Sequence, residues 1–238
     1  TDEFVKIATN MSSIGLLTPD GILTGAHGVP SGSTFTNTVD SIVQYLVTLS
    51  FYLTGECTYE EALRILDLSS IQGDDGVYVV PDKLVDSFYK HFASFGLNVN
   101  IEKSYTSKKS VIFLQLLYTK DLYECGVYPI YRALNRLVHL ERFTDFSKDD
   151  LAGRDYFGIR AISILENCKN HPLFRDFVLF IAKRNKYSLL PSAKGLRKYE
   201  KFVYESSGAD DIIYHQYGQN TKGFNEFETV KILRSYGL

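Results

Sequence analysis

The amino-acid sequence predicts an α+β fold, and three features carry that prediction. Apolar residues recur at helical spacing over residues 33–53. Two short runs of β-forming residues then flank a turn within residues 70–80. An amphipathic helical pattern over residues 81–96 leads into strand-like runs at 97–101 and 111–118. The order is therefore helix, hairpin, helix, strand, strand, which belongs to the α+β class.

The N-terminal segment, residues 1–30, is predicted to form short strands and turns. Pro19-Asp20-Gly21 is a strong turn signal, and further glycines and a proline interrupt the rest. The helix that follows should begin near Ser33, end at Gly55 and bury one face. That face would consist of Thr36, Val39, Val43, Leu46, Val47 and Leu53.

A second helix should begin at Thr58-Tyr59-Glu60-Glu61, because Thr followed three residues later by Glu forms a capping box. It should continue to about Leu66. After it, residues 70–72 and 77–80 are predicted to pair as a hairpin. The tip of that hairpin would be Gly73-Asp74-Asp75-Gly76, so its charge is concentrated at the turn.

Pro81 and Asp82 are predicted to open a third helix, with Gly96 just past its C-terminal end. The residues expected to face inward are Leu84, Val85, Phe88, Phe92 and Phe95.

Strand signals fade beyond about residue 122, where we expect a boundary between two parts of the chain. The first part, residues 1–122, mixes sheet and helix, and the second, residues 123–238, is mainly helical. The second part should contain helices at 131–143, 151–167 and 173–184. Residues after Gly208 are polar, aromatic and poorly periodic, and no element is predicted there.

The bulk composition restricts the class of protein. No apolar run approaches the ~18–20 residues that span a bilayer, and no signal peptide is visible at the N-terminus. Because an initiating Met is missing, we expect the chain to begin partway into a longer protein. The three cysteines are widely spaced, which favours a reducing compartment.

Charge is distributed unequally along the chain. Residues 1–122 carry 8 Lys+Arg against 14 Asp+Glu, or −6, whereas residues 123–238 carry 18 against 14, or +4. An acidic half suited to cations would thus be joined to a basic half suited to phosphates. Alternatively, the difference in charge between the two halves reflects only ordinary variation of surface residues.

The adjacent carboxylates Asp74 and Asp75 are the strongest chemical signal. A tight hairpin holds such groups by backbone geometry, and two divalent ions about 3.5–4 Å apart need carboxylate oxygens of this kind for phosphoryl transfer. Mg²⁺ suits the site because it prefers oxygen ligands and leaves room for phosphates and water. Alternatively, Asp75-Gly76 is only a favourable turn sequence.

Three flanking segments strengthen the functional interpretation. Upstream, Pro30-Ser31-Gly32 forms a small-residue loop entering a helix, where a nucleotide could approach the backbone closely. Downstream, Asn100-Ile101-Glu102-Lys103 follows the third helix, and Val111-Ile112-Phe113-Leu114-Gln115 comes next.

Taken in order, these segments resemble motifs B, C, D and E of viral RNA-dependent RNA polymerases. The resemblance is closest to the double-stranded-RNA partitivirus and picobirnavirus type, through the Ser31-to-Ser41 run and Asn170-His171-Pro172-Leu173. It covers roughly residues 20–120 well and the helical remainder loosely. It implies a polymerase palm, an antiparallel sheet with packed helices, followed by a mostly helical thumb. The chain would then be a fragment of a right-hand polymerase.

The resemblance also implies roles for individual residues. Asp74 would be the main metal ligand and Asp75 a second one, holding Mg²⁺ or alternatively Mn²⁺. Lys103 would protonate the pyrophosphate leaving group. The residues implied in binding nucleotide and template are Ser31, Gly32, Ser33, Thr36 and Asp40, and the strand implied beneath the growing 3′ end is Phe113-Leu114-Gln115.

Two departures from the family pattern stand out. Asp40 occupies the place of an Asn that reads the ribose 2′-hydroxyl; it can accept that hydrogen bond but cannot donate one. The strand of motif A, with the other essential aspartate, has no match upstream of Ser31. Asp145 and Asp150 have its spacing but follow the other motifs, and Ser147 with Asp150 is better interpreted as a helix cap. The chain alone should therefore be inactive.

The second half of the chain carries a weaker signal for binding RNA. Arg132 and Arg136 lie four residues apart on one predicted helix. A further basic cluster, interleaved with Tyr187 and Tyr199, consists of Lys183, Arg184, Lys186, Lys194, Arg197, Lys198 and Lys201. These side chains would either track RNA phosphates or form a solvated helical surface.

The leading hypothesis is RNA-templated RNA synthesis by two-metal nucleotidyl transfer in viral genome replication and transcription. The expected partners are RNA template and product, nucleoside triphosphates and a viral capsid protein, with no membrane. The expected location is the virion interior or the host cytoplasm. The alternatives are a reverse transcriptase, which Gln72-Gly73 before the aspartates disfavours, and a non-catalytic RNA-binding or assembly module.

Overall fold

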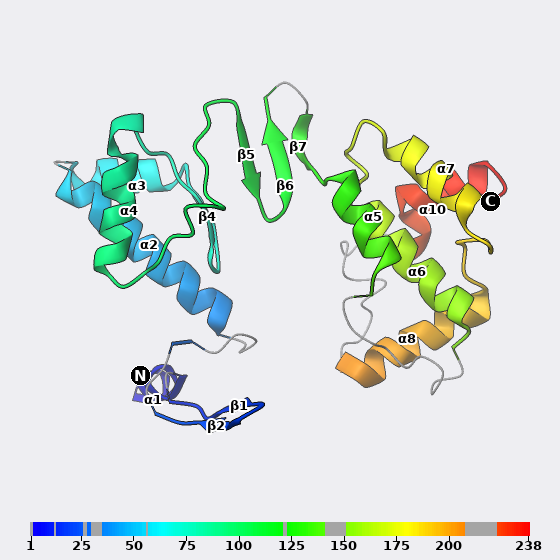
Figure 1. Ribbon diagram of the computed structural model, residues 1–238, viewed down its shortest axis with the longest axis horizontal. Coiled ribbons are helices and arrows are strands. Elements are labelled where there is room, and N and C mark those ends of the chain that lie inside the picture. The colour runs from blue at the N-terminus through cyan, green and yellow to red at the C-terminus, as the bar shows by residue number, and fades with distance from the viewer. Residues whose placement is uncertain are drawn as a thin grey trace. The chain divides into compact units, whose positions relative to one another are not determined.

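The computed structural model has the α+β fold predicted from the sequence (Figure 1). It divides into two compact units, residues 1–114 and 115–238. The structure describes residues 2–11, 13–25, 28–29, 35–55, 57–120, 123–140, 151–207 and 223–238.

The first unit opens with a helix that the sequence analysis missed. Helix α1 spans Asp2–Met11, so the prediction of only strands and turns over residues 1–30 was wrong there. The sequence has apolar residues at 4, 7, 8 and 11, a helical spacing, with two acidic residues in the first turn. Strands β1 (Leu16–Thr18) and β2 (Gly21–Leu23) then pair antiparallel around the predicted turn.

Helix α2 (Thr36–Thr54) is the long helix of the first unit, and Gly55 ends it as predicted. Helix α3 (Tyr59–Leu66) begins with the predicted capping box, in which Thr58 Oγ1 accepts from the Glu61 amide at 3.3 Å and the Thr58 amide donates to Glu61 Oε2 at 2.9 Å. The backbone bond from Thr58 lowers the pKa of the Glu61 carboxyl.

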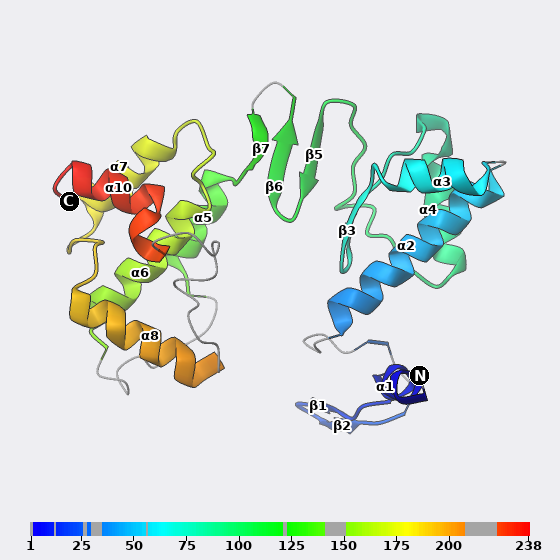
Figure 2. The ribbon, with the colours of Figure 1, turned by 180° about the vertical axis from the view of Figure 1, so that it is seen from behind.

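Strands β3 (Ser70–Gln72) and β4 (Asp75–Val77) form the predicted hairpin, but it is tighter than expected. Gln72 pairs with Asp75, so only Gly73 and Asp74 remain in the turn. Asp75 and Gly76 therefore lie in a strand rather than at the tip. Figure 1 and Figure 2 show this hairpin against α2, in agreement with the contacts between α2 and β3.

A short 3-10 turn, η1 (Asp82–Leu84), leads into α4 (Val85–Ser94), which packs on α2. The core between these helices consists of Val47, Phe51, Tyr52, Ala62, Phe88 and Phe92. The predicted inward faces were partly wrong, since Leu46, Leu53 and Phe95 are 56%, 41% and 56% exposed. Helix α2 contacts its neighbours through the face that contains Val47, Thr48, Phe51 and Tyr52, which turns Leu46 and Leu53 outward.

Residues 97–101 do not form the predicted strand. Gly96 ends α4 with φ +78°, and the amides of Lys103 and Ser104 donate to the Asn100 carbonyl at 3.2 and 3.0 Å. The Leu97 amide likewise donates to the Phe92 carbonyl at 3.1 Å, so backbone groups at both ends of the predicted strand are already bonded elsewhere.

The single strand predicted over 111–118 is two strands, β5 (Ser110–Phe113) and β6 (Leu116–Thr119). Leu114 and Gln115 between them both have positive φ, the geometry of a tight hairpin turn. Strand β7 (Tyr123–Val127), which was not predicted, pairs antiparallel with β6 and completes a sheet of order β5-β6-β7.

The second unit is mainly helical, as expected. Its helices are α5 (Ile130–Val138), α6 (Gly153–Glu166), α7 (Phe174–Arg184), α8 (Ala193–Ser207) and α10 (Glu228–Ser235), with a 3-10 turn η3 at Gly223–Glu226. Helix α5 ends five residues earlier than predicted because His139 is extended. The prediction that Ser147 and Asp150 cap a helix falls on residues 141–150, outside the described part. Fully buried Ile162, Leu165, Val178 and Leu233 lie at the centre of this core.

Two buried carboxylates cap helices in this unit. Asp155 accepts from the amide and hydroxyl of Ser192, at 2.9 and 3.1 Å, at the start of α8. A Cβ on Gly195 would lie 2.2 Å from the Asp155 carboxyl group, so only glycine fits there. Glu166 accepts from the Glu228 and Thr229 amides and from the Thr229 hydroxyl at the start of α10. Each buried acid is thus satisfied by a helix N-terminus.

No described helix combines the length and apolar character needed to cross a bilayer.

Candidate functional site

A row of polar side chains on α2 holds the aspartate-bearing hairpin. Ser41 Oγ accepts a hydrogen bond from the Gly73 amide at 2.8 Å, and the Gln44 side-chain amide donates to the Gly73 carbonyl. Asn37, one turn earlier, lies against the same glycine. These positions, i, i+4 and i+7, share one face of the helix. The turn before Asp74 is therefore fixed to α2 through both backbone groups of Gly73.

Gly73 itself is required by this close approach. It is buried and has φ +61°, a conformation that L side chains rarely adopt. A Cβ at this position would meet Asn37 Oδ1 at 3.0 Å. Only a glycine can therefore bring the turn this close to α2, while Asp74 and Asp75 beyond it remain exposed.

Tyr78 binds the oxygen of the Gln44 side-chain amide. Its hydroxyl donates to Gln44 Oε1, and its ring packs on Phe88 and Phe92, with centroids 5.1 and 5.9 Å away. Burial raises the pKa of Tyr78 to about 12, so the hydroxyl stays protonated and remains a donor. A Cβ on Gly76 would lie 2.2 Å from the Tyr78 hydroxyl oxygen, which explains glycine at that place in β4.

Tyr52 of α2 holds the segment that follows the hairpin. Its hydroxyl donates to the Val79 carbonyl at 2.8 Å, and burial raises its pKa to about 12. The segment from Gly73 to Val79 is thus bonded to α2 at three successive levels, through Ser41, Gln44 and Tyr52.

The carboxylates of Asp74 and Asp75 are exposed and, among the described residues, neither takes part in a hydrogen bond or ion pair. Their oxygens are therefore available to a hard cation such as Mg²⁺. Within the same residues no group of three His, Cys, Asp or Glu side chains is gathered for a metal. The donor set present fits part of a metal site and needs further oxygen ligands.

The residues expected in nucleotide binding are only partly within the described structure. Thr36 is the first residue of α2 and is half-buried. Asp40 is half-buried on the same helix, and in the described part of the chain its carboxylate has no hydrogen-bonding or ionic partner. Ser31, Gly32 and Ser33 lie outside the described residues.

Lys103 lies in the exposed turn 101–103, and within the described structure no hydrogen bond or ion pair joins its ammonium group to Asp74 or Asp75. The Phe113–Gln115 segment is not a continuous strand, because β5 ends at Phe113 and the next two residues turn. Gln115 Oε1 accepts from the Tyr128 hydroxyl at 3.4 Å.

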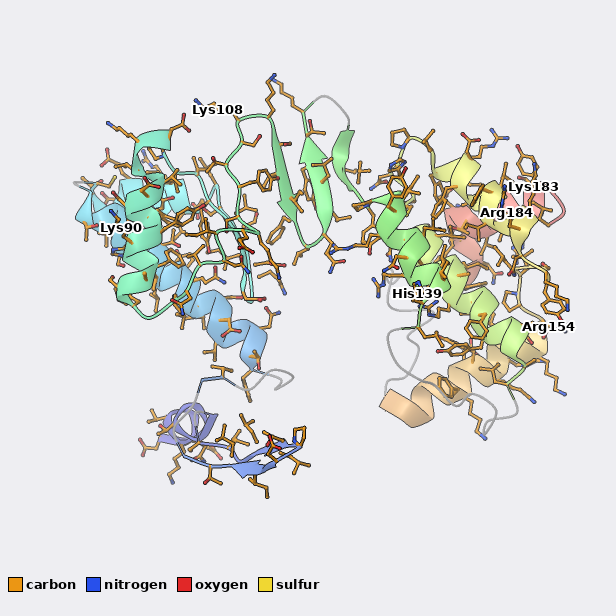
Figure 3. All side chains as sticks on the ribbon, in the orientation of Figure 1. Lys90, Lys108, His139, Arg154, Lys183 and Arg184 are labelled. Carbon is orange, nitrogen blue, oxygen red and sulfur yellow. The ribbon has the colours of Figure 1, made fainter. Side chains whose placement is uncertain are left out.

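The basic residues singled out from the sequence of the second unit lie on α5, α7 and α8, except Lys186, which lies between α7 and α8. The Arg184 guanidinium is 4.0 Å from the centroid of the Phe180 ring, and the Lys186 ammonium is 5.5 Å from that of Tyr187. Figure 3 shows Lys183 and Arg184 together at the C-terminal end of α7. On α5, Arg136 donates to the Tyr128 hydroxyl at 3.5 Å, whereas Arg132 is exposed.

Sequence reasoning did not select Asn37, Gln44 or Tyr78 as site residues. A signal for the first two existed, because Asn37, Ser41 and Gln44 form a polar stripe at spacings of four and three on an amphipathic helix. A polar stripe that continues toward a buried face indicates hydrogen bonding to a neighbouring backbone. Tyr78 gave no such signal, since tyrosine in a strand-like run is ordinary.

Comparisons with known proteins identify the family of this chain. A family profile described as viral RNA-dependent RNA polymerase matches residues 1–182. A potential RNA-dependent RNA polymerase of Human picobirnavirus (strain Human/Thailand/Hy005102/-) is 33% identical over 169 residues, which cover 69% of this chain and 30% of that protein.

Solved structures of the same kind are also similar. The crystal structure of the RNA-dependent RNA polymerase of a human picobirnavirus has a TM-score of 0.72 and 26% identity, over 98% of this chain and 45% of that one. Its insertion-loop deletion mutant has a TM-score of 0.70 and 28% identity, over 95% and 41%. The chain thus spans less than half the length of each of these relatives. Its match to the family profile and to these proteins means that the chain belongs to the viral RNA-dependent RNA polymerase family.

Proposed function

We propose that this chain is the palm and thumb part of an enzyme that synthesises RNA on an RNA template during viral genome replication and transcription. Residues 1–122 would be the palm with a short segment that connects to the fingers, and residues 123–238 the mainly helical thumb. The observation that supports the proposal most is the pair of hydrogen bonds from α2 to Gly73, next to the exposed Asp74 and Asp75. Among the described residues neither carboxylate has a hydrogen-bonding or ionic partner. Family membership supplies the reaction class.

Asp74 and Asp75 would hold Mg²⁺, or Mn²⁺ in its place, together with a carboxylate from outside the described residues. When bound, the ions would lower the charge cost of the displacement at the attacking and leaving oxygens. Asp74 lies in the turn and Asp75 at the start of β4, so their carboxylates leave the backbone at successive residues. Following the resemblance to motif C, Asp74 is proposed as the main ligand and Asp75 as the second.

The chain's own residues would handle nucleotide and leaving group. The primer 3′-hydroxyl releases its proton to solvent as its oxygen attacks the α-phosphorus, the bond from that phosphorus to pyrophosphate breaks, and Lys103 Nζ donates a proton to the departing oxygen. An exposed turn suits this role, because the ammonium keeps its ordinary donors and can reach a polyphosphate. Asp40 would accept from the ribose 2′-hydroxyl, beside Thr36 and the Ser31–Ser33 loop.

The second unit would contact RNA. From Phe177 to Tyr199 the chain has six Lys and Arg residues and no Asp or Glu. Phe180 and Tyr187 are 43% and 53% exposed, and cations lie over both rings. Exposed rings and cations together suit stacking on bases and neutralising phosphates. From the resemblance we further propose a location in the virion interior or the host cytoplasm and contact with a viral capsid protein.

The decisive experiment measures RNA synthesis by the full-length protein that contains this segment. Asp74→Asn should lower the rate more than ~100-fold, because it removes a charge that acts on the transition state, while RNA binding is retained. Asp67→Asn is the matched control, since Asp67 is an exposed aspartate at the end of α3.

The two alternatives predict different results. A non-catalytic RNA-binding or assembly module would give unchanged synthesis by the Asp74→Asn protein. A reverse transcriptase would incorporate deoxynucleotides in clear preference to ribonucleotides on the same template.

A further inference from the structure

We infer that Ser41 and Gln44 are positioning residues that set the orientation of the metal-binding aspartate through the Gly73 peptide. The inference rests on the proposed function of Asp74. Neither residue has a substrate-binding role in the proposed mechanism. Their hydrogen bonds in the described part of the chain go to Gly73, to the Tyr78 hydroxyl and, within α2, to the Asn37 carbonyl.

Ser41 has both of its hydrogen-bonding roles defined. Its hydroxyl donates to the Asn37 carbonyl at 2.6 Å, within α2, so its oxygen presents a lone pair to the Gly73 amide at 2.8 Å. That bond fixes the peptide plane that precedes Gly73. Because the donor direction is already taken, the hydroxyl cannot rotate away without losing a second bond.

Gln44 fixes the peptide plane that follows Gly73. Tyr78 donates to its oxygen, so its amide nitrogen is the atom directed at the Gly73 carbonyl. The Tyr78 ring is itself held by Phe88 and Phe92 of α4. A continuous series of contacts therefore runs from the α4 core through Tyr78 and Gln44 to the peptide that ends at the Asp74 nitrogen.

This arrangement determines the direction of Asp74. Gly73 has φ +61°, and glycine in general adopts positive and negative φ about equally, so the pairing of β3 with β4 alone leaves more than one turn geometry open to it. With the amide and the carbonyl of Gly73 both bonded to α2, its two backbone dihedrals are set. The Asp74 Cα–Cβ direction follows directly from those dihedrals, whereas its exposed side chain has no contact of its own, among the described residues, to hold it.

The test compares variants of the full-length protein for the Mg²⁺ concentration that gives half-maximal RNA synthesis. Gln44→Glu keeps an acceptor for Tyr78 but replaces the donor to Gly73 with a carboxylate. Ser41→Ala removes only the acceptor for the Gly73 amide. Each should raise the Mg²⁺ midpoint about 3- to 10-fold, the equilibrium equivalent of one ordinary hydrogen bond. Thr38→Ala, an exposed position on the same helix, should leave the midpoint unchanged.

A pH profile separates positioning from a general packing role. In Gln44→Glu a protonated carboxyl group would again donate to the Gly73 carbonyl. The activity of this variant relative to the parent should therefore rise as the pH falls from about 8 to about 6. A flat ratio together with a parental Mg²⁺ midpoint would overturn the inference.

The remaining outcomes are also decisive. If Gln44→Glu does not fold, Ser41→Ala alone decides, because it removes one oxygen and adds no charge. If the unaltered protein is active and Asp74→Asn is inactive while Ser41→Ala keeps the parental midpoint, the positioning role fails and the proposed function stands. If Asp74→Asn is fully active, the proposed function itself fails.

Discussion

The cap that Glu166 places on α10 gives a sharp quantitative prediction about stability. Glu166 ends α6, is 6% exposed and accepts three hydrogen bonds, from the Glu228 amide at 3.1 Å and from the Thr229 amide and hydroxyl at 2.9 Å each. Glu166→Ala removes all three acceptors. Loss of a helix cap costs about 1 kcal/mol, and a buried hydroxyl left without a partner costs about 1–3 kcal/mol. The local stability of α10 should therefore fall by about 2–4 kcal/mol.

Native-state hydrogen exchange of the α10 amides measures this directly, because each 1.4 kcal/mol changes the exchange rate about tenfold. Amides in Val230–Leu233 should exchange ~30- to ~1,000-fold faster in Glu166→Ala than in the unaltered chain. Lys231→Ala is the control, since it removes only ion pairs on the exposed face of α10.

A second background isolates the hydroxyl contribution. Thr229→Val removes the hydroxyl that would be stranded, so Glu166→Ala should cost less when it is combined with Thr229→Val than when Thr229 is retained. Exchange rates for α10 that stay within twofold of the unaltered chain after Glu166→Ala would refute the reasoning, because the cap would then contribute nothing.

Four further predictions follow from particular contacts. Gly76→Ala should destabilise the first unit by about 1–3 kcal/mol, because the new Cβ would overlap the Tyr78 hydroxyl, and an unchanged melting temperature would contradict this. The folded-state pKa values of Tyr52 and Tyr78 are raised from 10.0 to about 12. The stability that the two protonated hydroxyl groups contribute is therefore complete below pH 10 and is lost as the pH rises through about 12. Phenolate absorbance should show that both tyrosines ionise together with unfolding of the first unit. Cys168 is fully buried with its pKa raised to about 11, so a thiol reagent should label only two of the three cysteines in the folded chain and all three after denaturation. Arg184→Ala should weaken RNA binding by the full-length protein and reduce the slope of log affinity against log salt by about 1, whereas an unchanged slope would place Arg184 away from the phosphates.

The sequence was sufficient to predict those elements that depend only on neighbouring residues. The capping box at Thr58, the hairpin around Gly73 and the C-terminal glycine of α4 were all predicted, because each depends on a few neighbouring residues. Strand β7 and the turn at Leu114 were not, since β7 exists by pairing with β6 and the turn uses positive φ at residues that do not favour it.

The candidate site divides in the same way. Asp74 and Asp75 could be selected because adjacent carboxylates in a turn are visible in the sequence. The partners of Gly73 could not, since Ser41 and Gln44 precede it by 32 and 29 residues and only the folded helix brings them to its two backbone groups. The exposed side of α2 was misjudged for a related reason, because the helix has apolar residues on more than one face.

The cap at Asp155 has a consequence for how mutations in the second unit should be interpreted. Its carboxylate fixes the first turn of α8, the helix that carries Lys194, Arg197 and Lys198. The position and direction of the basic side chains on α8 therefore depend on the buried Asp155 of α6. An inherited change at Asp155 or Gly195 would alter no charge on the outside of the molecule, yet under the proposed RNA contact of the second unit we expect it to weaken RNA binding.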